Sequence, residues 1–368
     1  MWGFIFLAGI TISCQMEEPN LSKSPESALN LPSNPFNYGM VEGDDLPTLG
    51  RVLFYDPRLS INNSVACGSC HKQALAFADQ APLSLGFENK TTSRNSMPIQ
   101  NIVASSFVSV PDPNSGQSPL PTALFWDGRQ KVLEEMVLEP IQNHIEMGSL
   151  DLNQLALELS DIPDYRVLFQ KAYPNQGVII NQFTIGRALA AFLVSIRSTE
   201  SRFDLFLRGA GGLTELELLG FNLFFDKYDC NSCHQLQSPV NGYQLAGEGD
   251  FGGFADIGLD PEPIDAGAFR ISGNPTDEGK FKIPSLRNVA LTSPYMHDGR
   301  FETLEEVMDH YSEGINTSPN LDPRLRVGSG EAKQFLIPVE DQTAMVAFLN
   351  SMTDNQMITD IKFSNPFK

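Results

Sequence analysis

Two copies of the pattern C-x-x-C-H constrain this 368-residue chain more strongly than any other feature of its sequence. The first copy, CGSCH, occupies residues 67–71, and the second, CNSCH, occupies residues 230–234. Together they contain four of the five cysteines, and the fifth is Cys14. No cysteine is therefore left to form a structural disulfide.

The pattern is typical of covalent attachment of a c-type haem, because two thiols add to the vinyl groups and the histidine binds iron. A redox-active dithiol and half of a zinc site are the alternatives. A dithiol does not require the histidine twice, however, and a zinc site needs further thiol or imidazole ligands. We therefore expect two haem c groups with His71 and His234 as proximal iron ligands, attached through Cys67, Cys70, Cys230 and Cys233.

The N-terminal segment predicts export. Residues 1–13 form an apolar stretch that suits a signal peptide but is too short to span a bilayer. The sequence TISC, which ends at Cys14, resembles a bacterial lipobox, and residues 14–37 are typical of a flexible tether. We expect a lipoprotein-type signal peptide, a lipid on Cys14 as the sole membrane attachment, and a location in the periplasm or outer envelope of a bacterium. A plain cleaved signal peptide and a buried helix are the alternatives.

The net charge of the chain limits the kinds of macromolecule that it can bind. The chain has 45 Asp and Glu residues against 25 Lys and Arg residues, which gives a formal net charge of −20. A surface this acidic repels phosphate, so nucleic acid is not expected as a partner, whereas a basic protein would be attracted.

Apolar residues at helical spacing indicate that helices dominate the chain. The segments with this periodicity are 46–55, 132–137, 152–159, 165–172 and 183–196. A capping box of Thr214 and Glu217 predicts a further helix after the glycine-rich residues 208–212. We expect one apolar face on that helix, formed by Leu216, Leu219, Leu223 and Phe224. The composition of residues 81–120 and 242–287 predicts loops, and the second loop could wrap a large flat cofactor.

A helix precedes each C-x-x-C-H pattern, which indicates a weak internal duplication with one pattern in each of two domains. We expect a mainly α fold, with an N-terminal haem domain over residues 38–208 and a C-terminal haem domain over residues 209–355. Residues 356–368 are expected to form a C-terminal tail.

Four further segments resemble a known family. They read FWDGR (125–129), PIQNHIEM (140–147), FKIPSLRN (281–288) and PYMHDGRF (294–301). They are similar to the bacterial di-haem cytochrome c peroxidases and their MauG-type relatives, and the resemblance extends from about residue 35 to residue 349. It implies two cytochrome c-like helical domains, each with one covalently bound haem, that face each other across an interface.

The resemblance implies that the N-terminal haem is the peroxidatic one and that Glu146 works in its distal pocket. A carboxylate there can take a proton from bound peroxide and return it to the leaving oxygen. Many members close this haem with a distal histidine, but the matching residue here is Phe87, so we expect an open pocket that needs no reductive activation. Met136 replaces a distal glutamine, although it also fits the apolar stripe of a helix. A less polar pocket and lower peroxidase efficiency would follow.

On the other haem, the resemblance places Tyr311 at the distal ligand position, which is a Met in many peroxidases and a Tyr in MauG. A capping box at residues 303–306 begins a helix whose buried stripe includes Tyr311 and Met308, with His310 at its edge. A hard phenolate oxygen favours ferric iron, so we expect a low potential. A core tyrosine, or Met308 or His310 as the ligand, are the alternatives.

The family also implies two features of the interface. The indole of Trp126 would stand between the haems and relay electrons, with plain core packing as the alternative. A calcium ion would be held by the side chain of Asn95 and the backbone carbonyls of Thr292 and Pro294, all of which are oxygen donors suited to a hard cation.

Taken together, these features predict an oxidoreductase that reduces hydrogen peroxide to water with electrons from a small redox protein, such as a basic cytochrome c or a cupredoxin. Electrons would arrive near His234, pass Trp126 and reach the haem on His71. One alternative is a MauG-like enzyme that oxidises a protein side chain or an organic substrate through a high-valent state. Another is a non-catalytic electron carrier, which would require both irons to be closed. The resemblance also implies that a homodimer can form.

Overall fold

The computed structural model describes residues 45–102, 124–149, 151–174, 179–234 and 253–367. The expected signal peptide over 1–13, the lipidated Cys14 and the tether over 14–37 lie outside these residues. In the described part of the chain, no helix has both the length and the apolar character needed to cross a membrane.

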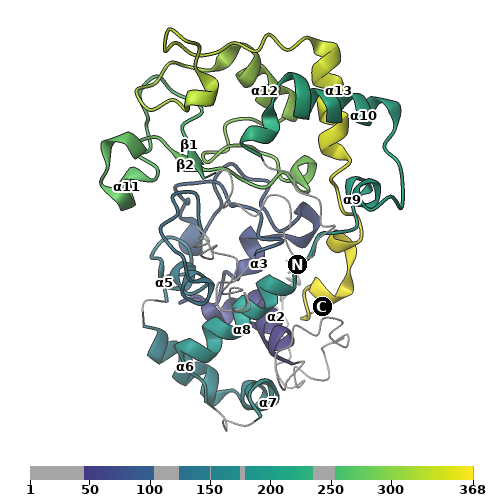
Figure 1. Ribbon diagram of the computed structural model, residues 1–368. Coiled ribbons are helices and arrows are strands. Elements are labelled where there is room, and N and C mark those ends of the chain that lie inside the picture. The colour runs from purple at the N-terminus through teal and green to yellow at the C-terminus, as the bar shows by residue number, and fades with distance from the viewer. Residues whose placement is uncertain (1–44, 103–123, 150, 175–178, 235–252, 368) are drawn as a thin grey trace, which may run out of the picture.

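The fold is mainly helical, as predicted. The N-terminal half contains α2 (Leu46–Tyr55), α3 (Cys67–Cys70), α4 (Leu133–Met136), α5 (Glu139–Gln142), α6 (Leu152–Asp161), α7 (Pro163–Ala172) and α8 (Gln182–Ser195). These helices surround one hydrophobic core at one end of the molecule (Figure 1). The predicted helices therefore form at the expected places, and only their ends differ by a few residues.

The C-terminal half has its own hydrophobic core at the opposite end of the molecule (Figure 1). Its helices are α9 (Arg202–Leu207), α10 (Glu215–Asn222), α11 (Phe269–Ser272), α12 (Leu304–Asp309) and α13 (Val339–Asn350). Two π-helical turns, Leu223–Lys227 and His310–Gly314, continue α10 and α12. A short antiparallel sheet of β1 (Phe254–Ala255) and β2 (Phe281–Lys282) lies where the two halves meet.

The two cores are built around the same kind of helix contact. A Cβ atom on Gly50 of α2 would collide with the carbonyl oxygen of Ala188 on α8. In the same way, a Cβ atom on Gly220 of α10 would collide with the carbonyl oxygen of Ala344 on α13. Each half thus has a helix pair in which a glycine lets two backbones approach closely. This repetition supports the internal duplication, while the assignment of one haem domain to each half stays a prediction.

The expected face of α10 is partly wrong. The capping box forms, because the Thr214 amide donates to the Glu217 carboxylate and the Glu217 amide donates to Oγ1 of Thr214. However, Leu216 and Leu219 are 45% and 47% exposed, whereas Leu223 and Phe224 are buried. The close approach at Gly220 sets which face meets α13, and the π-helical turn shifts the helical phase beyond it.

The end of the chain packs against the other half. The Phe363 side chain is buried in the N-terminal core, and its carbonyl accepts a hydrogen bond of 2.8 Å from the hydroxyl of Tyr55. Arg51 donates to the carbonyl of Ser364 at 2.6 Å. Residues 356–367, which belong to the predicted C-terminal tail, therefore tie the C-terminal half to the N-terminal core.

Candidate functional site

The first C-x-x-C-H motif presents its histidine in the form that a metal ligand needs. Its two cysteines stand at the ends of the one-turn helix α3, and burial raises the pKa of the Cys67 thiol to about 12. The Nδ1 atom of His71 lies 2.9 Å from the carbonyl oxygen of Phe77, and burial lowers the pKa of this histidine. A neutral imidazole whose Nδ1–H is held by a carbonyl directs Nε2 towards a metal.

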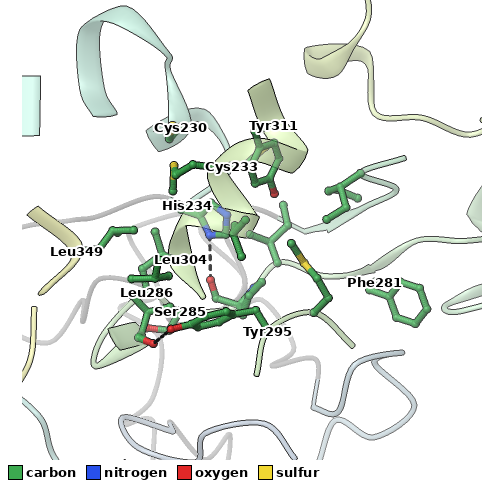
Figure 2. A pocket seen from close by; sticks show the side chains of 18 of the residues that line it. Cys230, Cys233, His234, Phe281, Ser285, Leu286, Tyr295, Leu304, Tyr311 and Leu349 are labelled. Carbon is green, nitrogen blue, oxygen red and sulfur yellow. Dashed lines mark hydrogen bonds between the residues drawn. The ribbon is translucent and has the colours of Figure 1, made fainter. Parts of the chain in front are cut away.

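The second motif repeats this arrangement from a different backbone. Here Nδ1 of His234 lies 3.1 Å from the carbonyl oxygen of Pro284, as the dashed line in Figure 2 shows. Burial again lowers the pKa of the histidine and raises the pKa of the Cys230 thiol to about 12. Each histidine therefore holds Nδ1 against a backbone carbonyl, which is near the motif in sequence for His71 and distant from it for His234. In both motifs Nε2 is the nitrogen that would bind iron.

A cavity of about 320 Å³ adjoins the second motif. Cys230, Cys233 and His234 line one part of it, and most of the other lining side chains are apolar (Figure 2). A volume above about 300 Å³ with apolar walls and few polar groups is typical of a site for an organic cofactor. Two thiols, a neutral imidazole and apolar walls fit a covalently bound haem.

Tyr311 lies in the π-helical turn His310–Gly314 and lines this cavity, and Figure 2 shows its hydroxyl directed towards the interior. Burial raises the pKa of this hydroxyl well above its ordinary value. Met308 lines the cavity as well, but the Nε2 atom of His310 lies 3.0 Å from the carbonyl oxygen of Ile257. The geometry therefore favours Tyr311 or Met308 over His310 as an iron ligand, and ligation by Tyr311 stays a prediction.

Glu146 lies near the first motif. Its negative charge contributes to the raised pKa values of the Cys67 and Cys70 thiols, after the larger effect of burial. The Nδ2 atom of Asn143 donates to Oε1 of Glu146 at 2.9 Å. Burial raises the pKa of Glu146, while the positive charge of Arg129 opposes this shift. The shift favours the protonated carboxyl group, which is the direction that a group donating a proton requires.

The segment around Phe87, which is predicted to replace a distal histidine, lies directly against Glu146. The amide of Phe87 donates to the carbonyl oxygen of Glu146 at 2.9 Å, and a Cβ atom on Gly86 would collide with the carbonyl oxygen of Ile145. The Phe87 ring is buried, and the ammonium of Lys90 lies 4.0 Å from its centroid. This position therefore holds a hydrocarbon ring, which cannot bind iron.

Met136 is buried in the N-terminal core, together with Leu133 and Val137, as its apolar stripe predicts. Val132, the fourth member of that stripe, is 37% exposed because it stands before the first turn of α4.

Trp126 comes from the N-terminal half but lines the cavity of the second motif. Its Nε1–H donates to the carbonyl oxygen of Asn95 at 2.9 Å, and its own carbonyl accepts from the amide of Lys282 at 2.8 Å. Because Lys282 belongs to β2, these bonds hold the indole where the two halves meet, as a relay position requires.

The three residues predicted to hold calcium also lie at this cavity. The Nδ2 atom of Asn95 donates to the carbonyl oxygens of Ala81 and Pro82, at 3.3 and 3.2 Å. In the described residues, no group of three or more His, Cys, Asp or Glu side chains could hold a metal ion. A calcium site made of the Asn95 amide and the carbonyls of Thr292 and Pro294 stays a prediction.

The structure brings to the cavity several residues that were not predicted as site residues, although Tyr295 and His297 belong to the segment PYMHDGRF. The ring of His297 is buried and stacks on Phe281 with 3.7 Å between centroids. Tyr228 and Tyr295 also line the cavity. The position of Tyr228, two residues before Cys230, was the one available signal, but its partner Asp341 is more than a hundred residues away.

Comparison with known proteins places this site in a family. Residues 45–211 match the family described as di-haem cytochrome c peroxidase. The chain is 32% identical to cytochrome c551 peroxidase of Nitrosomonas europaea over 321 residues, which cover 85% of this chain and 88% of that protein. It is 31% identical to the methylamine utilization protein MauG of Methylorubrum extorquens over 333 residues, which cover 90% and 82%.

Solved structures agree with this result. The crystal structure of a MauG-like protein associated with microbial copper homeostasis matches with a TM-score of 0.72 and 32% identity, over 92% of this chain and 97% of that one. The diheme peroxidase BthA from Burkholderia thailandensis has the same fold, with a TM-score of 0.69 and 21% identity over 89% and 92%. The chain therefore belongs to the di-haem cytochrome c peroxidase family, which also contains the MauG proteins.

Membership in this family confirms two predictions, that the protein is an oxidoreductase of the cytochrome c peroxidase type and that it carries two c-type haems. It does not decide between a peroxidase and a MauG-like activity, because relatives of both kinds match equally well.

Proposed function

We propose that this protein reduces hydrogen peroxide to water at the first motif, with electrons that a small redox protein delivers near the second. The observation that supports this proposal most directly is Glu146, a half-buried carboxyl group near the two cysteines of the first motif. A haem bound there supplies an iron atom that can bind peroxide and exchange electrons.

Glu146 performs the proton transfers in this proposal. Burial raises its pKa and so favours the protonated carboxyl group relative to an exposed one, and the ionised carboxylate can take a proton back. The hydrogen bond from Asn143 fixes the orientation of Oε1 and leaves the other carboxyl oxygen for the substrate. Phe87 adds no ligand on this side, so peroxide needs no prior displacement of a histidine.

The second motif has the composition of an electron-transfer site in this proposal. Tyr311 would offer an oxygen ligand to a haem held at His234, and Trp126 lies where the two halves meet. The negative charge of the chain favours a donor with a basic face.

A MauG-like oxidation of a protein side chain or organic substrate is the second candidate. The observation that favours it is the hydroxyl of Tyr311 in the cavity, together with the hydrocarbon ring at Phe87. A hard oxygen ligand stabilises oxidised iron and would let the second centre share the oxidising equivalents.

Peroxide consumption by the holoprotein with a reduced basic cytochrome c tests the proposal. We expect Glu146→Gln to lower kcat by roughly 10²–10⁴-fold, because glutamine cannot transfer the proton. Glu88→Gln is the matched control, since Glu88 lies in the same segment as Phe87 and its side chain is 62% exposed. Equal loss in both variants, or full activity of Glu146→Gln, would contradict the role of Glu146.

A further inference from the structure

Both π-helical turns of the C-terminal half bring a tyrosine to the same cavity. Tyr311 lies within the turn His310–Gly314, and Tyr228 directly follows the turn Leu223–Lys227. The amide of Tyr228 donates to the carbonyl oxygen of Leu223 at 2.9 Å, and this hydrogen bond closes the turn Leu223–Lys227. Insertions of this kind are frequent at functional sites.

Tyr228 connects the cavity with the protein surface. Its ring is only 6% exposed, but its hydroxyl donates to Oδ2 of Asp341 at 2.6 Å. The same carboxylate oxygen lies 2.5 Å from Nζ of Lys227, and the side chains of Asp341 and Lys227 are 17% and 54% exposed. One edge of this tyrosine therefore faces the haem cavity, and the other meets a carboxylate that water reaches.

This hydrogen bond is the feature that a redox-active tyrosine requires. A phenol that loses one electron becomes a strong acid, so its oxidation is favourable only where a base can take the proton. Asp341 is such a base, because an ionised carboxylate accepts protons. Tyr295 lines the same cavity, but its hydroxyl donates to the backbone carbonyl of Val289 at 3.1 Å, and a carbonyl cannot take up a proton near neutral pH.

We propose that Tyr228 is a proton-coupled relay that carries single electrons from small organic reductants at the protein surface to the second centre. This inference rests on the proposed function, because hydrogen peroxide supplies the oxidising equivalents. In the oxidation step the O–H bond of Tyr228 breaks and its proton moves to Oδ2 of Asp341, while an oxidised haem held by Cys230, Cys233 and His234 would take up the electron. A one-electron reductant, such as a phenol or ascorbate, then returns the electron, and Asp341 returns the proton. The substrate need not reach the cavity.

Electron paramagnetic resonance of the oxidised holoprotein, frozen shortly after addition of hydrogen peroxide, tests this relay. We expect a tyrosyl radical signal in the unmodified protein and in Tyr295→Phe, and its loss to background in Tyr228→Phe. Asp341→Asn keeps an oxygen that accepts the hydrogen bond but removes the base, so its signal should be strongly reduced. Oxidation of ascorbate should slow most in Tyr228→Phe, less in Asp341→Asn and not in Tyr295→Phe. Haem content and melting temperature show whether each variant folds.

A radical of equal intensity in Tyr228→Phe would overturn the relay. Failure of the proposed function is a separate outcome, recognised by haem absorption bands that do not respond to peroxide. In that event, flash photolysis with a photo-oxidised ruthenium polypyridyl complex can oxidise the tyrosine by one electron without peroxide. The tyrosyl yield should again fall in Tyr228→Phe and not in Tyr295→Phe, and an equal yield in both would contradict the relay.

Discussion

The two C-x-x-C-H regions hold their histidines in the same way and differ in what surrounds them. His71 and His234 each place Nδ1 against a backbone carbonyl, at 2.9 and 3.1 Å. The first region adds a half-buried carboxyl group, Glu146, whereas the second adds a cavity with Tyr311. The motif therefore determines how a haem is attached, and residues distant in sequence determine what that haem can do.

The helices around the two regions also share one feature and differ in another. Glycine contacts at Gly50 and Gly220 repeat in both halves, but π-helical turns in the described residues occur only in the C-terminal half, at Leu223–Lys227 and His310–Gly314. Each of these turns inserts one residue into a helix and re-aims the side chains that follow it. A repeated scaffold thus becomes two different sites through small local insertions.

The largest effect that can separate the two regions is expected from Tyr311→Phe. Loss of the hydroxyl should change the low-spin spectrum of one haem and raise its potential by on the order of 0.1 V, a modest part of the ~0.8 V range that axial ligands span. Spectroelectrochemistry of the holoprotein measures both quantities. Met308→Leu removes the rival ligand in the same cavity and should leave both haem spectra unchanged if Tyr311 is the ligand. An unchanged spectrum in Tyr311→Phe, or a changed spectrum of both haems, would contradict the separate roles of the regions.

A smaller effect is expected at the two glycine contacts. Gly50→Ala and Gly220→Ala should each destabilise the protein by about 1–3 kcal/mol, because the added methyl group forces two helices apart. Differential scanning calorimetry should show that each variant mainly affects its own half. Gly328→Ala is the control, because no atom lies within 4 Å of its added Cβ. If both variants shift a single transition equally, the two halves unfold as one unit.

The smallest effect concerns the ion pairs that join the halves. Arg94 contacts Asp127 at 2.6 Å and Asp265 at 2.7 Å. Burial alone would raise the pKa of Asp265, but hydrogen bonds from Arg94 and the Gly267 amide outweigh it and lower the pKa to about 2.

Because this pKa is depressed in the folded state, the ion pair stabilises the protein above the unfolded pKa of about 3.9, and the contribution disappears as the pH falls towards 2. Asp265→Asn should therefore cost roughly 1–2 kcal/mol at neutral pH and flatten the stability curve between about pH 4 and 2. Urea unfolding at several pH values measures this slope. A parallel shift at every pH would show that Asp265 acts through packing instead.

Local features of the fold could be predicted from the sequence, and long-range ones could not. The helix expected over residues 46–55 matches α2, and both capping boxes form, because each depends on residues within one or two turns. The exposure of Leu216 follows from contact with α13, which begins more than a hundred residues later. The burial of Phe363 in the opposite core has the same kind of cause.

Part of the candidate site could also be predicted from the sequence, and part of it could not. The thiols and histidines were evident from one short pattern, and Glu146 and Tyr311 followed from a resemblance that the structure is consistent with. The pairing of Tyr228 with Asp341 could not be predicted from the position of Tyr228 beside Cys230, because the two residues meet only when α13 packs beside the second motif.

Electron paramagnetic resonance and resonance Raman spectra of the oxidised holoprotein test the central claim most directly. If the two regions differ as described, one haem is six-coordinate and low-spin, with Tyr311 as a ligand, and the other keeps an open position beside Glu146 that binds added ligands without prior reduction. Two six-coordinate low-spin haems, neither of which binds an added ligand, would contradict this account.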